Sequence, residues 1–211
     1  MQRLWFAITA AVALAGLAVQ SYVSATTPGV FATPAGRIFN MLCYFTIQSN
    51  VIVFATHALL AADPTRSGPV FRAFRLAGLI GITVTGVVYH TILRSLYDLT
   101  GLAHVADLLL HTATPILTVV GWLLFGPRGL AQPRTAFYAL LFPALYLVFT
   151  LIRGPIVDFY PYPFLDVALH GYGAVLLNSL GVAALFLFLA FGAVALDRLL
   201  SPKPAAEGSH P

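Results

Sequence analysis

The polar side chains of residues 44–50 are those in this sequence with the most obvious capacity for chemistry. They lie inside an apolar run, 38–61, where polar groups are costly unless they pair with one another or carry out a function. On a helix, Thr46, Ser49 and Asn50 share one face. That face holds two hydroxyls and an amide but no acid and no base. A nucleophile on it would therefore need its base from another helix.

The imidazole best placed to act as that base is His111, which lies well inside another apolar segment. Asp107 precedes it by one helical turn, so the carboxylate could orient the imidazole as the third group of a catalytic triad does. Pro115 cannot donate to the carbonyl of His111, and we expect a kinked, open backbone beside it. The alternative interpretation of this segment is a capped helix start with an interfacial aspartate.

Each of these polar residues also has a purely structural interpretation. A threonine in a membrane helix usually bonds back to the carbonyl four residues earlier, which could be all that Thr46 does. Ser49 and Asn50 could hold helices together. His90 and Arg94, spaced i, i+4, could bind a substrate carboxylate or reach the headgroups from the interface. The same choice applies to two further residues near helix ends, Arg153 and His170.

The composition identifies an integral membrane protein. Of 211 residues, 59% are hydrophobic and 9% are charged, against roughly 25% charged residues in a soluble domain. The arginines fall in short loops between apolar runs, so the net charge of +4 indicates contact with anionic headgroups and not with nucleic acid. The single cysteine, Cys43, excludes an internal disulfide and a cysteine-rich metal site. The histidine spacings fit neither a haem site nor a zinc-protease motif, and we predict no metal and no cofactor.

Six apolar segments are each near the length that crosses a bilayer, with Gly, Pro and Arg between them. We predict an all-α, six-helix transmembrane bundle over 1–200 and a disordered tail over 201–211. The first segment also resembles a secretory signal with a cleavage site, but its length favours a retained helix. The predicted helices are 4–23, 38–61, 73–96, 105–125, 136–152 and 173–196.

The basic residues are unequally divided between the two sides of such a bundle. Eight of the eleven fall on the side of the termini, which the positive-inside rule places in the cytoplasm. The chain is then a multi-pass protein of the cell membrane with both termini cytoplasmic. Five helices contribute polar residues to the outer half of this bundle: Thr46, His90, Arg94, His111, Arg153, His170 and Asn178.

Four stretches together resemble a bacterial family of six-helix membrane proteins. They are residues 44–50, 111–112, 122–127 and 160–166. That family is distantly similar to the animal androgen-induced membrane proteins, which are threonine hydrolases that cleave fatty acid esters of hydroxy fatty acids. The resemblance implies Thr46 as nucleophile, His111 as base, a lipid-like substrate taken from the bilayer, and a bacterial inner-membrane location.

A threonine hydroxyl is a poor nucleophile until a base takes its proton, so the resemblance requires the Thr46 hydroxyl within hydrogen-bond reach of a His111 nitrogen. An oxyanion would need donors, and Gln48, Ser49, Asn50 and Asn178 are the candidates. The aromatic, proline-containing loop 160–166 is either an interfacial belt or a lid over the outer mouth. The alternative function is a non-enzymatic carrier or small-molecule binding protein with an outer-facing polar pocket.

Overall fold

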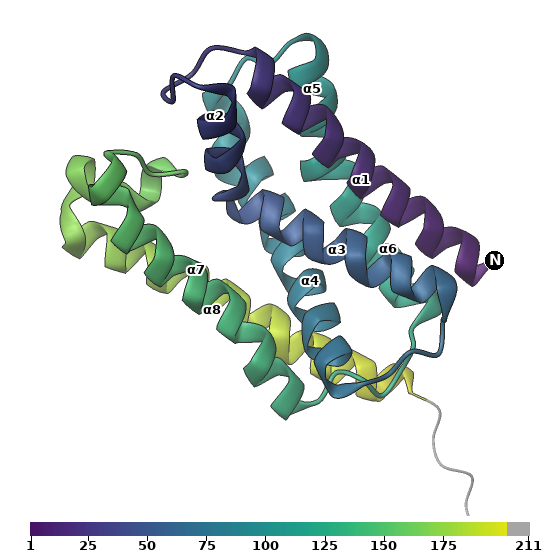
Figure 1. Ribbon diagram of the computed structural model, residues 1–211. Coiled ribbons are helices and arrows are strands. Elements are labelled where there is room, and N and C mark those ends of the chain that lie inside the picture. The colour runs from purple at the N-terminus through teal and green to yellow at the C-terminus, as the bar shows by residue number, and fades with distance from the viewer. Residues whose placement is uncertain (202–211) are drawn as a thin grey trace, which may run out of the picture.

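The computed structural model describes residues 1–201, which form helices joined by short loops and contain no strand (Figure 1). Within that range, six helical segments are long and apolar enough to cross a membrane. The predicted all-α fold with six candidate spans is confirmed at this level. All but Ser201 of the predicted tail lies outside the described residues. The six segments are Gln2–Thr26, Phe45–Ala62, Pro69–Leu96, Gly101–Phe125, Pro133–Val157 and Val167–Leu200.

The second predicted helix, 38–61, is two helices in the structure. A short helix, α2 (Pro34–Leu42), is capped by the Thr33 hydroxyl and ends before Cys43. The extended backbone of Tyr44 then begins α3 (Phe45–Ala62), with no side chain capping it. Thr46 therefore lies in the first turn of a helix and not in the middle of one. Amides of a first turn have no carbonyl of a preceding turn to bind.

The third and fourth spans each contain a π-helical turn. In the third span, α4 (Pro69–Val88) continues into η1 (Tyr89–Leu93) and the 3₁₀ turn η2 (Arg94–Leu96). In the fourth, η3 (Leu109–Ala113) separates α5 (Gly101–Leu108) from α6 (Thr114–Phe125). Such turns are rare in proteins overall, and those that occur are often found at functional sites.

The π turn in η3 changes which carbonyl Pro115 leaves free. Thr114 N donates to Leu109 O, five residues back. In the same register the missing N–H of Pro115 belongs opposite the carbonyl of Leu110. The carbonyl that Pro115 frees is therefore that of Leu110, one residue before the predicted His111.

The last two spans are longer than predicted and form a hairpin. α7 (Pro133–Val157) contains two internal prolines, and α8 (Val167–Leu200) is interrupted at Gly171, where φ is 72°. Between them, a loop over 158–166 contains the short 3₁₀ turn η4 (Pro163–Leu165). The Asp166 carboxylate caps α8 by accepting from Ala168 N at 2.9 Å and Leu169 N at 3.1 Å.

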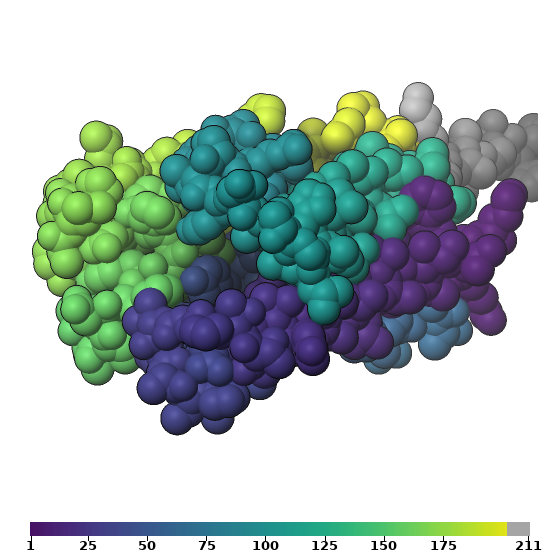
Figure 2. All heavy atoms as spheres, turned by 90° about the horizontal axis from the view of Figure 1, so that it is seen from above, coloured from purple at the N-terminus to yellow at the C-terminus, as the bar shows by residue number. Residues whose placement is uncertain are grey.

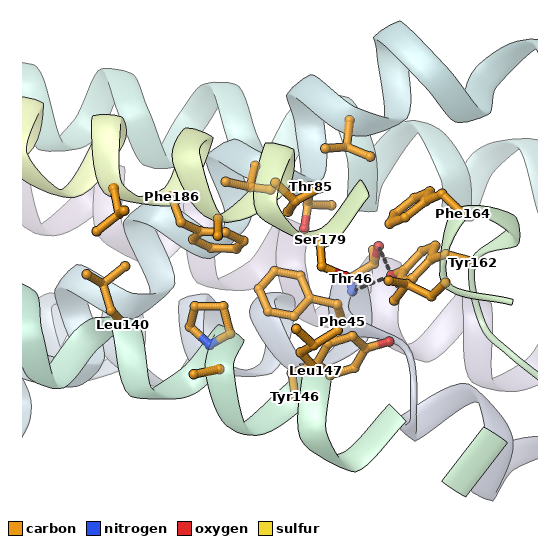
Figure 3. Close-up of a pocket in the computed structure, with 18 of the residues that line it drawn as sticks. Phe45, Thr46, Thr85, Leu140, Tyr146, Leu147, Tyr162, Phe164, Ser179 and Phe186 are labelled. Atoms are coloured by element: carbon orange, nitrogen blue, oxygen red, sulfur yellow. Dashed lines mark hydrogen bonds between the residues drawn. The ribbon is translucent and has the colours of Figure 1, made fainter. Parts of the chain in front are cut away.

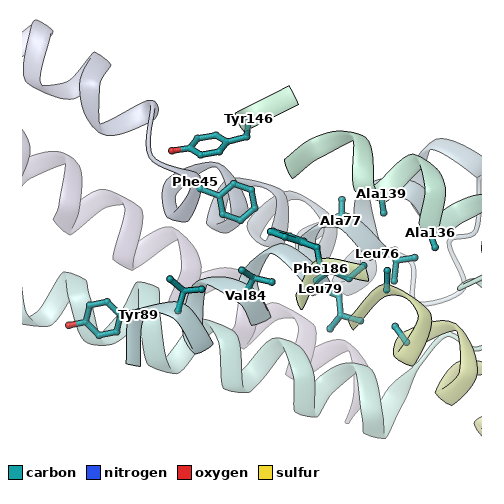
Figure 4. Close-up of a cluster of buried hydrophobic side chains, with 14 of the residues drawn as sticks. Phe45, Leu76, Ala77, Leu79, Val84, Tyr89, Ala136, Ala139, Tyr146 and Phe186 are labelled. Carbon is teal, nitrogen blue, oxygen red and sulfur yellow. The ribbon is translucent and has the colours of Figure 1, made fainter. Parts of the chain in front are cut away.

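The spans pack as two groups that share α4. α1 packs on α3, α5 and α6, and α3 packs on α4, whereas the α7–α8 hairpin packs on α4 (Figure 1). Phe45 joins the two groups, since its ring lies 5.0 Å from that of Tyr146 and 5.6 Å from that of Phe186 (Figure 4). The N-terminus and the end of α8 lie at one end of the bundle, and the 158–166 loop lies at the other (Figure 1).

Gly154 of α7 should be intolerant of any side chain, because the ring of Tyr160 lies directly on it and a Cβ there would overlap that ring. We predict that Gly154→Ala displaces the 158–166 loop and lowers the unfolding free energy by about 1–3 kcal/mol, the usual cost of overpacking. Thermal unfolding in detergent measures this. Gly181→Ala is the matched control, because a Cβ at Gly181 meets no atom within 4 Å of the described chain. Equal melting temperatures for the two variants would contradict the prediction.

Candidate functional site

Thr46 and His111 face each other across the α3–η3 contact. Thr46 Oγ1 lies 3.4 Å from His111 Nε2, slightly longer than the ~2.6–3.2 Å between a nucleophile and its base in a reacting complex and typical of the looser contact in a site without substrate. Thr46 is 6% exposed, and the side chain of His111 is 18% exposed. The hydroxyl is therefore sheltered, while the imidazole keeps contact with the outside.

The imidazole is held by two neighbours. Asp107 Oδ1 lies 2.9 Å from His111 Nδ1, one turn before it on the same helix. The hydrogen-bond pattern assigns the ring proton to Nδ1 and leaves the Nε2 lone pair toward Thr46. Tyr89, from η1, donates to Asp107 Oδ2 at 2.6 Å and stacks on the imidazole with ring centroids 4.1 Å apart. The contact with Asp107 thus fixes the rotation of the His111 ring, and the stacked Tyr89 ring fixes the tilt of its plane.

Tyr162 is a member of this site that the sequence analysis did not identify. Its hydroxyl accepts from Thr46 N at 3.2 Å and lies 3.2 Å from Thr46 Oγ1 (Figure 3). Burial raises the pKa of the Tyr162 phenol, and hydrogen bonds with Thr46 only partly oppose that shift. The phenol therefore keeps its proton and can donate. The sequence pointed to the loop that carries Tyr162 but not to this hydroxyl.

Because each hydroxyl has one proton, the contacts define a directed chain of hydrogen bonds. With the imidazole proton on Nδ1, Nε2 can only accept, so the Thr46 proton is directed at it and Thr46 Oγ1 is left to accept from the Tyr162 hydroxyl. His111 Nδ1–H then donates to Asp107, whose second oxygen accepts from Tyr89. The chain ends on a carboxylate, so a positive charge that develops on the imidazole is stabilised.

Of the two roles predicted for Asn50, the structure shows the one that holds helices together. Its Nδ2 donates to Thr46 O at 2.8 Å and to Leu110 O at 3.3 Å. The second acceptor is the carbonyl that the π turn and Pro115 leave free. Both amide hydrogens are used, so Asn50 has none left for an oxyanion.

The other predicted oxyanion donors also point elsewhere. Ser49 Oγ is buried against α4, where a Cβ at Gly81 would lie 2.9 Å from it. Gln48 Nε2 donates to Leu42 O at 3.1 Å, and Asn178 Nδ2 donates to Phe164 O at 3.1 Å. The donors that remain beside Thr46 are the Tyr162 hydroxyl and the first-turn amides of α3.

Of the four predicted substrate-binding residues, the structure brings one into contact with a neighbour of the site. His90 Nε2 lies 3.0 Å from Thr112 Oγ1, next to His111. Arg94 is exposed one turn further along, and His170 is exposed at the start of α8. Arg153 has other partners, because it donates to Asn40 Oδ1 at 2.9 Å and lies over Phe31.

A cavity of about 340 Å³ extends from Thr46 between α3, α4 and the α7–α8 hairpin (Figure 3). Its walls carry no charged residue and no histidine. Seen from above, the surface is hollowed between the green, teal and purple segments of the chain (Figure 2). The lining residues that Figure 3 labels are Phe45, Thr46, Thr85, Leu140, Tyr146, Leu147, Tyr162, Phe164, Ser179 and Phe186. Within residues 1–201, no group of three or more His, Cys, Asp or Glu side chains could hold a metal ion.

Replacement of Asn50 by alanine should destabilise the protein, because it leaves the buried carbonyl of Leu110 without a donor. We expect a loss of about 1–3 kcal/mol in the free energy of unfolding. Gln48→Ala is the control, since that side chain bonds one carbonyl at an exposed site, and it should change stability by less than about 0.5 kcal/mol. Thermal unfolding of both variants in the same detergent tests this, and a stable Asn50→Ala protein would refute the role assigned to Asn50.

No protein-family model, no curated protein and no solved structure matches this chain. A functional assignment therefore has to be carried by the geometry around Thr46.

Proposed function

We propose that the protein is an intramembrane lipid ester hydrolase, with Thr46 as nucleophile, His111 as general base and Asp107 as the group that orients the imidazole. One observation carries the proposal: Thr46 contacts a histidine–aspartate pair and also forms part of the wall of an apolar cavity. A nucleophile at the end of a chamber without charges is suited to an ester that carries a hydrocarbon chain. Residues 44–50 and 111–112 resemble a bacterial six-helix membrane family that is distantly similar to threonine hydrolases, and this resemblance points to the same assignment.

The reaction would proceed in two acyl-transfer steps. As Thr46 Oγ attacks the ester carbonyl, its proton passes to His111 Nε2, and a tetrahedral intermediate forms. The bond from the carbonyl carbon to the alcohol oxygen breaks, and His111 gives the proton to the departing alkoxide. Water then attacks the acyl-threonine and loses a proton to His111. When the acyl–Oγ bond breaks, that proton returns to Thr46 Oγ.

The negative oxygen of the tetrahedral intermediate would lie at the start of α3. The N–H of Thr46 is the nearest donor, and the Tyr162 hydroxyl becomes a second one once Thr46 Oγ1 is bonded to the substrate carbon and accepts from it less well. The positive end of the helix dipole also favours a negative charge there. Tyr162 now accepts from that N–H, so a substrate oxygen would replace it as acceptor. One such donor typically contributes about 10²–10³ in rate.

For the substrate, we favour a fatty acid ester of a hydroxy fatty acid. The cavity fits a hydrocarbon chain, and the side of the site beside His111 carries His90, which contacts Thr112. Arg94 is exposed one turn beyond His90, so a carboxylate on the alcohol half of the ester would meet a cationic edge. No residue of this arrangement requires a cofactor.

We further propose a location in the cell membrane, with both termini cytoplasmic and the Thr46 site toward the outer leaflet. The support is the distribution of basic residues. Seven of the described ones belong to the end of the bundle that holds the termini, and three belong to the end that holds the 158–166 loop. The seven are Arg3, Arg66, Arg72, Arg75, Arg128, Arg134 and Arg198.

Cysteine accessibility tests this orientation. In a Cys43→Ala background, Asp98→Cys should react with a membrane-impermeant maleimide in intact cells, because residue 98 is exposed at the proposed outer end. Arg66→Cys, exposed at the opposite end, should react only after the membrane is permeabilised. The reverse pattern would place the Thr46 site on the cytoplasmic side.

Covalent labelling tests the nucleophile. A fluorophosphonate should modify the wild-type protein at Thr46, and Thr46→Ala should abolish both labelling and ester hydrolysis. Thr46→Ser should retain part of each, because it keeps the hydroxyl. Ser49→Ala is the matched control, since Ser49 faces Gly81 and not His111. If Ser49→Ala removes the adduct and Thr46→Ala does not, the assigned nucleophile is wrong by one helical turn.

A further inference from the structure

The cavity meets the proposed catalytic residues on one side only. Thr46 and Tyr162 form part of its wall, whereas His111 and Asp107 do not. His111 instead contacts Thr46 from the more exposed side of the site. His90 and Thr112, which contact each other, lie beside His111 on that side. The Thr46 hydroxyl thus lies on the boundary between an apolar chamber and a more polar, open edge.

We infer, on the basis of the proposed hydrolysis, that the cavity binds the acyl half of the ester and limits its length, while the alcohol half lies outside it beside His111. The reason is the position of the acid that must protonate the leaving group. His111 Nε2 gives its proton to the alcohol oxygen, so that oxygen must lie on the His111 side of Thr46. The acyl chain, on the opposite side of the carbonyl carbon, is then directed into the cavity.

The shape and lining of the cavity fit a single hydrocarbon chain. Thr46 and Tyr162 lie toward one end and Leu140 toward the other (Figure 3). Ser179 and Phe186 line it from α8, and seven residues of helix span about 10 Å. At about 340 Å³, the cavity is near the lower limit of small-molecule pockets, ~300–1,000 Å³. This volume favours a chain of medium length over a long one.

Two small side chains of the cavity wall are exposed. Ala144 of α7 and Ala183 of α8 both line the cavity, and neither is buried. Their small side chains leave room through which an acyl chain could enter from the bilayer. A larger side chain at Ala183 should therefore fill part of the cavity without touching the hydrogen bonds of Thr46.

The test compares Ala183→Phe with Leu180→Phe, a control on the same helix that is 66% exposed and does not line the cavity. Nitrophenyl esters of butanoate, octanoate and hexadecanoate serve as probes for the full-length protein in detergent. We expect the wild-type protein to prefer octanoate. Ala183→Phe should lower the ratio of octanoate to butanoate kcat/KM by about tenfold or more, because binding space for several methylenes is lost. Leu180→Phe should leave that ratio unchanged.

Two further measurements make the inference refutable on its own. Octanoate esters of short and long alcohols should keep their relative rates in Ala183→Phe; if this variant discriminates by alcohol length and not by acyl length, the assigned orientation is overturned. A diazirine-bearing fatty acid should cross-link to α7 and α8 in the wild-type protein and not in Ala183→Phe. If that pattern appears while no ester is cleaved, the hydrolase proposal fails and the acyl cavity stands. Absence of cross-linking to the cavity overturns the acyl site itself.

Discussion

The site depends on the two hydrogen bonds that Asn50 donates. One goes to the carbonyl of Thr46 in the same helix, and the other goes to the carbonyl of Leu110 in η3. A buried carbonyl without a partner costs about 1–3 kcal/mol, so the donor that reaches Leu110 stabilises the π turn of the fourth span. The same amide therefore stabilises the irregular turn that presents His111 and fixes that turn against α3. Thr46 and His111 meet because Asn50 joins their two backbones.

Backbone irregularity is how these apolar helices present polar groups to one another. The first-turn amide of Thr46 has no partner within α3 and donates to the Tyr162 hydroxyl, because the chain leaves helical geometry at Tyr44. Tyr89 and His111 both lie on π turns and stack on each other. At each of these departures a residue of the site contacts another segment, because Thr46 bonds Tyr162 and Tyr89 stacks on His111. A regular helix at any of the three positions would rotate a side chain of the site away from its partner.

The spans were predictable from the sequence because crossing a bilayer needs about 20 apolar residues, and hydropathy reports that requirement directly. The pairing of Asp107 with His111 followed from their spacing on one helix. The break before Thr46 did not follow, because neither Cys43 nor Tyr44 is a residue that ends helices and the apolar pattern continues through them. Tyr162 could not be assigned either, since its position depends on how a loop folds over α3, a region 116 residues away in the chain. The sequence left two roles open for Asn50, oxyanion donor or link between helices, because a free amide and one that binds carbonyls look alike in a sequence.

Buried polar residues at the opposite end of the bundle show why burial alone does not identify a site. Arg75 donates to the carbonyl of Gly126, and Asp197 accepts from Ala131 N at 2.8 Å, so both hold the connection between α6 and α7. Their hydrogen bonds end on backbone groups. The hydrogen bonds around Thr46 instead run from a phenol through a hydroxyl and an imidazole to a carboxylate, and the hydroxyl borders an apolar cavity. A chain of groups that can pass a proton, beside a space that can hold a substrate, has a chemical use that anchoring of a loop does not require.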